Sequence, residues 1–77
     1  MILTKREEQL IDDFGALARK KGYREETIEL ALMLCNTVDM VEKYGSEEQA
    51  LEEVIKLCEQ YDSGRAFIAA VGDLIGL

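Results

Sequence analysis

Residues 46–61, SEEQALEEVIKLCEQY, carry the clearest structural signal in the chain. Ser46 is a favourable helix N-cap, and Gln49 follows it by three residues, which is the spacing of a capping box. Downstream, apolar residues recur every three or four positions, as they do on one face of an α-helix. The stretch therefore predicts an amphipathic helix over residues 47–61. Its inward-facing residues are Ala50, Leu51, Val54, Leu57, Cys58 and Tyr61.

The residues before Ser46 predict a longer and more apolar helix over residues 24–44. Gly45 supplies its C-terminal stop, whereas Arg24 is a poor N-cap. The apolar residues fall in two rows, so the helix has a wide buried face and we expect it to lie at the centre of the fold. The first row is Ile28, Ala31, Leu32, Cys35 and Val38, and the second is Leu30, Leu34, Val41 and Tyr44.

Two further helices are predicted at the ends of the chain. Thr4 and Glu7 form a second capping box, and a glycine directly after residue 21 ends a predicted helix over residues 5–21. At the other end, residues 62–64, DSG, predict a turn. A nearly apolar helix over residues 65–75 follows this turn, with Asp73 as its one acidic residue.

The chain of 77 residues is long enough for one domain, and we expect residues 1–77 to form a single helical domain. Proline is absent and strong helix formers are abundant. The loops between the four predicted helices are short, which makes consecutive helices antiparallel neighbours. The sequence thus predicts an all-α fold, a compact up-down antiparallel four-helix bundle, with orthogonal helix packing as the open alternative.

The net charge of −7 excludes several kinds of partner. The acidic excess lies between residues 25 and 62, which carry eleven acids and two bases. Such a surface repels phosphate groups, so we expect neither direct nucleic-acid binding nor binding to an anionic membrane. The longest apolar-rich stretch, residues 66–77, is too short to span a bilayer. The N-terminus becomes charged too early for a signal peptide, so we expect a cytoplasmic protein.

The residue types needed for catalysis or metal binding are scarce. The chain has no histidine, and Cys35 and Cys58 lack a C-x-x-C spacing. Two thiols without histidine partners fall short of a metal site, so we expect both to fill small core positions. Whether they are ever oxidised is left open by the pattern. Ser46 and Ser63 act as caps without a base to activate them. We therefore predict no catalytic, cofactor-binding or metal-binding residue and no enzymatic activity.

The helix over residues 65–75 has more apolar surface than one face of a bundle requires. Packing against the helix over residues 24–44 accounts for this surface at least as well as contact with a partner. Contact with a partner is the functional hypothesis: a protein–protein interaction module that forms a homodimer or binds another protein. The expected apolar interface is Phe67, Ile68, Val71, Leu74 and Ile75.

The acidic middle of the chain supports an alternative function. A surface of carboxylates resembles the charge of a nucleic acid and would attract a basic partner. The alternative is therefore an inhibitor that occupies the basic groove of a DNA- or RNA-handling protein, although a solvated face that maintains solubility explains the same residues. The acidic interface expected for it is Glu47, Glu48, Glu52, Glu53 and Glu59.

Overall fold

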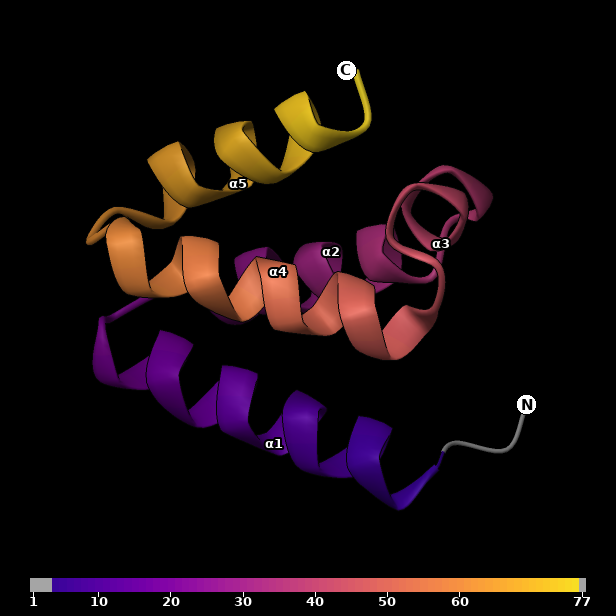
Figure 1. Cartoon of the computed structure of the whole chain (residues 1–77). Coiled ribbons are helices and arrows are strands. Elements are labelled where there is room, and N and C mark those ends of the chain that lie inside the picture. The colour runs from indigo at the N-terminus through magenta and orange to yellow at the C-terminus, as the bar shows by residue number, and fades with distance from the viewer. Residues whose placement is uncertain (1–3, 77) are drawn as a thin grey trace.

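The computed structural model describes residues 4–76, and 81% of these residues are helical. The described part contains no strand, which confirms the all-α prediction. Five helices follow one another along the chain (Figure 1). They are α1 (Lys5–Lys20), α2 (Glu25–Cys35), α3 (Val38–Tyr44), α4 (Glu47–Gln60) and α5 (Gly64–Leu74).

The N-caps of the two predicted capping boxes begin α1 and α4. The Thr4 side chain accepts a hydrogen bond from the backbone N–H of Glu7 at 3.0 Å. The Ser46 hydroxyl accepts one from the backbone N–H of Gln49 at 3.1 Å. Gly22 follows α1 with a positive φ of 84°, a conformation that glycine adopts without steric cost. Local signals therefore fix these helix ends within a residue or two of the predicted positions.

The single helix predicted over residues 24–44 is wrong, because the chain bends at Thr37 and forms two helices. Thr37 has φ −79° and ψ 154°, which is extended rather than helical. Its hydroxyl donates to the carbonyl of Leu34 at 2.8 Å and accepts from the backbone N–H of Met40 at 3.3 Å. Thr37 thus acts as the N-cap of α3, and the four-helix count becomes five.

The bend changes which apolar residues face the core. In a continuous helix Val38 would extend the buried row of α2, but in the structure its side chain is exposed. Met40 is fully buried instead. Gly45 then ends α3 with a φ of 90°, as predicted for the C-terminus of this region.

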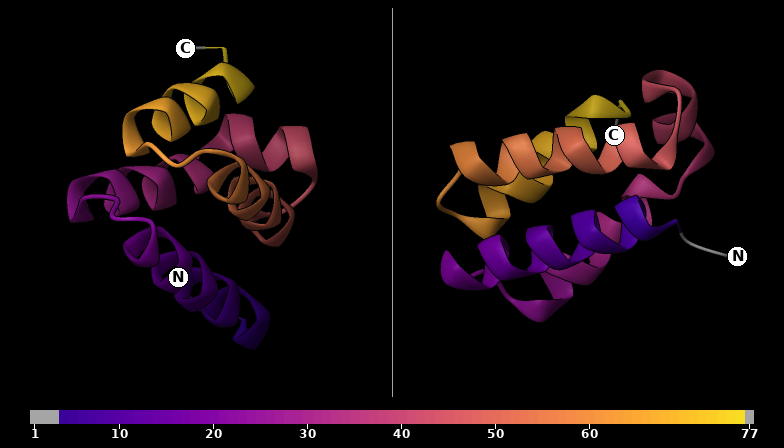
Figure 2. Two further views of the ribbon diagram at one scale, coloured as in Figure 1. Left: turned by 90° about the vertical axis from the view of Figure 1, so that its left-hand side faces the viewer. Right: turned by 60° about the horizontal axis from the view of Figure 1, so that its bottom comes forward.

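The four longer helices lie in three levels, and α3 closes one end (Figures 1 and 2). α2 and α4 form the middle level, with α1 on one side of them and α5 on the other. α1 and α4 run in the same direction, because Thr4 bonds Glu48 near one end and Lys21 bonds the Glu59 carbonyl near the other. The direction alternates from α1 to α2, α4 and α5. α1 nevertheless packs chiefly on α4, which runs parallel to it, so the predicted up-down antiparallel four-helix bundle is not confirmed.

An aromatic cluster joins the N-terminal and C-terminal parts of the core. The ring of Phe67 on α5 lies 5.7 Å from the ring of Phe14 on α1 and 5.1 Å from that of Tyr23. The Tyr23 hydroxyl donates to the carbonyl of Tyr61. The hydroxyl therefore finds its hydrogen-bond partner within the chain, as buried tyrosines usually do. The buried hydrophobic residues are Leu10, Phe14, Ala18, Tyr23, Ile28, Ala31, Cys35, Met40, Ala50, Leu51, Val54, Cys58, Phe67 and Val71.

Replacing Phe67 by alanine tests the importance of this cluster. We expect Phe67→Ala to lower the free energy of unfolding by about 3–5 kcal/mol, because it leaves a cavity against two aromatic rings. Urea unfolding followed by circular dichroism measures the loss. Ile68→Ala, at a half-buried neighbouring position, is the matched control and should cost less. A loss below about 1 kcal/mol for Phe67→Ala would show that the core does not depend on this contact.

Candidate functional site

The predicted apolar interface divides between the core and the surface. Phe67 and Val71 have no exposed surface and belong to the core. Ile68, Leu74 and Ile75 are partly buried and pack against that core. The stripe on α5 is thus directed mainly at the helices beneath it. A partner could reach the edge of this stripe but not its centre.

Among residues 4–76, the most exposed large apolar side chains lie instead on α2 and α3. Leu30 is 42% exposed, Met33 68% and Val38 70%. These three residues are named here the α2–α3 ridge: Leu30 lies in the middle of α2, Met33 near its C-terminal end and Val38 at the start of α3. Scattered exposed apolar residues are common in folded proteins, but neighbouring ones mark candidate contact surfaces.

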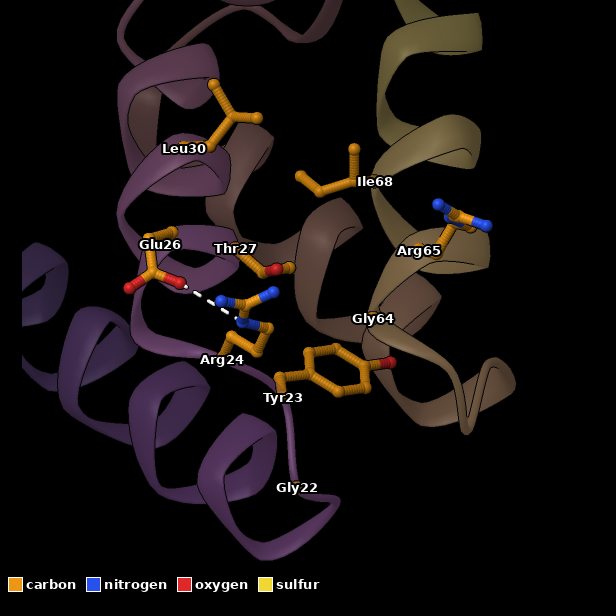
Figure 3. Close-up of a pocket in the computed structure, with 9 residues that line it drawn as sticks. All are labelled: Gly22, Tyr23, Arg24, Glu26, Thr27, Leu30, Gly64, Arg65 and Ile68. Carbon is orange, nitrogen blue, oxygen red and sulfur yellow. Dashed lines mark ion pairs between the residues drawn. The ribbon is translucent and has the colours of Figure 1, made fainter.

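A groove between α2 and α5 continues from the ridge (Figure 3). Its volume is about 380 Å³. Leu30 on α2 and Ile68 on α5 point toward each other across it. At its other end the Arg24 guanidinium lies beside Thr27 and forms an ion pair with Glu26 at 3.2 Å. The groove therefore has an apolar part next to the ridge and a polar part at the N-terminus of α2.

A second groove, of about 450 Å³, lies between α1 and α4. Its apolar floor is formed by Leu10, Leu17 and Ile55. Charged side chains surround this floor, and the ion pair of Arg6 with Glu52, at 3.2 Å, joins the two helices. Part of the charged rim is thus engaged within the chain.

Most of the predicted acidic interface is engaged with neighbouring side chains. Glu48 accepts a hydrogen bond from the hydroxyl of Thr4, Glu52 pairs with Arg6, and Glu53 pairs with Lys56 at 3.1 Å.

The other two glutamates of the predicted acidic interface, Glu47 and Glu59, lie in different surroundings. The pKa of Glu47 is raised by partial burial and then by the neighbouring Glu7 carboxylate. Glu59 is exposed, and its carboxylate belongs to none of the ion pairs found among residues 4–76. The structure therefore does not gather the five acids into one uncompensated patch.

Both cysteines are free thiols in the core, and neither belongs to the ridge or lines either groove. Burial, and then the Glu47 carboxylate, raises the pKa of Cys35 to about 12. Burial is also the largest cause of the raised pKa of Cys58. Thiols that stay protonated are poor nucleophiles and poor metal ligands. Within residues 4–76, no three His, Cys, Asp or Glu side chains come together in a way that could hold a metal ion.

Comparison with known proteins adds no family or relative to this picture. No protein-family model matches the chain, and no curated protein or solved structure is significantly similar to it. Among the described helices, none combines the length and the apolar character needed to cross a membrane. The assignment of the ridge and the adjacent α2–α5 groove as the candidate site therefore rests on the structure alone.

The sequence contained a signal for the bend that creates this site. Asn36 and Thr37 stand in the middle of an otherwise strong helical pattern, and both residue types prefer caps and turns because their side chains bond the backbone. Asp39 follows within the first turn, as is usual after an N-cap. Reading these residues as a cap would have predicted that Val38 leaves the buried row.

The raised pKa of Cys35 predicts a dependence of stability on alkaline pH. The folded pKa of about 12 lies above the ordinary value of 9.0, so the protonated thiol is favoured in the folded state. Its contribution to stability is complete below about pH 9 and is lost as the pH rises toward about 12. We expect the urea midpoint to fall over this window, and to fall less in Cys35→Ala at equal temperature. The same fall in both proteins would show that Cys35 does not contribute.

Proposed function

We propose that this protein is a small interaction module that acts by protein–protein contact, without catalysis, and that it self-associates through the α2–α3 ridge. The observation that supports the proposal is the exposure of Leu30, Met33 and Val38, three large apolar side chains on α2 and at the start of α3. The four longer helices serve as the scaffold that presents them. The free thiols are typical of proteins from a reducing compartment, and we infer a cytoplasmic location.

The composition of the ridge supports a contact surface. Interface centres are depleted of charged residues and enriched in methionine, and Met33 is the central member of the ridge. Burial of apolar area releases roughly 25 cal/mol per Å², so three such side chains removed from water favour association. The groove between Leu30 and Ile68 adds a concave apolar surface beside the ridge. The interface proposed here includes Ile68 but not Phe67 or Val71, which are buried.

The acidic inhibitor has less support from the geometry. Three of its five glutamates are engaged with Thr4, Arg6 and Lys56, which reduces the field that they present. A basic partner would have to replace these contacts. Its binding would also weaken steeply with salt, whereas contact through an apolar ridge resists salt.

A charged residue in the ridge tests self-association. We expect the wild-type mass from light scattering after gel filtration to rise toward a dimer with concentration, at low and high salt alike. Met33→Asp should weaken the dimer by about tenfold or more, because it places a charge in a desolvated contact. Ala16→Asp is the matched control, since it adds the same charge at an exposed position of α1.

Two results would contradict the proposal. The first is a wild-type protein that stays a monomer at the highest concentration tested and binds no partner protein whose binding depends on Met33. The second is equal weakening by Met33→Asp and Ala16→Asp, which would assign the effect to net charge and not to the ridge.

A further inference from the structure

The bend between α2 and α3 depends on the backbone of one residue. Asn36 has φ −94° and ψ 7°, and Thr37 has φ −79° and ψ 154°. Helical residues have φ near −63° and ψ near −42°. Only the ψ of Thr37 therefore lies far from the helical region. A rotation at this one bond, with small adjustments at Asn36, would join the two helices into a single helix over residues 25–44.

Apart from Asn36 and Thr37, which prefer caps and turns, the sequence suits such a helix. Residues 25–44 contain neither glycine nor proline. Val38, exposed at the bend, stands in the row of Ile28, Ala31 and Cys35 when the helical period is continued. The cap that holds the bend is modest, with a bond of 3.3 Å from the Met40 N–H to the Thr37 hydroxyl.

The bend divides the chain into two parts, and most of the contacts between helices join one part to the other. The first part is α1 and α2, and the second is α3, α4 and α5 (Figure 1). Phe14 contacts Phe67, Tyr23 bonds Tyr61, and Arg6 pairs with Glu52 across this division. Because these contacts do not involve the bend itself, the same surfaces fit together when the two parts come from different copies of the chain.

From this division we infer that the chain also forms a domain-swapped dimer, in which α2 and α3 are one straight helix. The second part of each copy then packs on the first part of the other. The contacts across the division are remade, except those between α2 and α3 at the bend, and the caps at the two bends are exchanged for helical hydrogen bonds. This inference does not rest on the proposed function, since the swapped dimer uses the core contacts and not the ridge.

The two forms should differ in how they depend on concentration. In the bent monomer the two parts are covalently linked, so their high effective concentration favours the monomer in dilute solution. Exchange requires the two parts to separate, which opens the core and makes interconversion slow. Refolding at millimolar concentration should therefore yield a slowly exchanging dimer, and refolding at micromolar concentration should yield monomer.

Substitutions at the bend test the straight helix. Val38→Pro fits the bent form, because position 38 is the first residue of α3 and Thr37 before it is extended. The same proline disrupts a straight helix, so we expect no dimer after concentrated refolding. Val38→Ala is the matched control, which removes the exposed side chain but permits both forms. Thr37→Ala removes the cap and should raise the dimer-to-monomer ratio by about fivefold or more.

A pair of charge reversals tests the exchange independently of the bend. Arg6→Glu and Glu52→Arg each place like charges opposite one another within a monomer, where the wild type has an ion pair at 3.2 Å. When the two variants are refolded together, a swapped heterodimer joins opposite charges at both sites. With surface pairs of roughly 0.5 kcal/mol each, we expect about a fivefold excess of heterodimer over the statistical ratio. Native mass spectrometry measures that ratio.

The outcomes separate the two kinds of dimer. The swap is supported if the dimer is lost in Val38→Pro but kept in Val38→Ala and Met33→Asp. It also requires an excess of the charge-reversed heterodimer over the statistical ratio. Equal dimer in Val38→Pro and Val38→Ala overturns the swap, and so does a statistical heterodimer ratio. If Val38→Pro fails to fold, as circular dichroism would show, the heterodimer ratio alone decides. Absence of any dimer of Thr37→Ala after concentrated refolding also overturns the inference.

Discussion

The contact of Phe67 with Phe14 and Tyr23 is the interaction on which the rest of the fold depends. A chain of 77 residues buries only a small core, so a few large side chains supply much of its stability. Phe67 comes from the last helix, whereas Phe14 and Tyr23 come from the first helix and the turn after it. The cluster therefore joins α5 to α1 and to the turn after α1, across the level formed by α2 and α4.

The parts of the fold that could be predicted are those with local causes. Thr4 and Ser46 bond backbone groups three residues away, and the glycines at 22 and 45 adopt positive φ, so neighbouring residues alone fix these ends. Thr37 is different, because the spacing of the apolar residues around it suited a continuous helix equally well. The outcome there is decided by tertiary contacts, because the bend lets Met40 enter the core beside α4. Periodicity does not contain that information.

The candidate site was predicted less well for a related reason. A periodic pattern shows which face of a helix is apolar, but not which helix covers that face. Phe67 and Val71 were correctly recognised as members of one stripe, and the structure places that stripe against the core. The exposed ridge arises where the pattern and the fold disagree, at Val38. Likewise, the sum of charges gave no indication that Glu48, Glu52 and Glu53 would each find a neighbour within the chain.

The disagreement at Val38 has an energetic meaning. In most folded proteins local preference and tertiary packing favour the same conformation, which separates the native state from its competitors. Here the helical period of residues 25–44 suits a straight helix, whereas the cap at Thr37 holds the bend. Two conformations then differ by only a few contacts, while the core that joins the two parts is common to both. The bend thus accounts both for the exposure of Val38 and for the inferred exchange between copies.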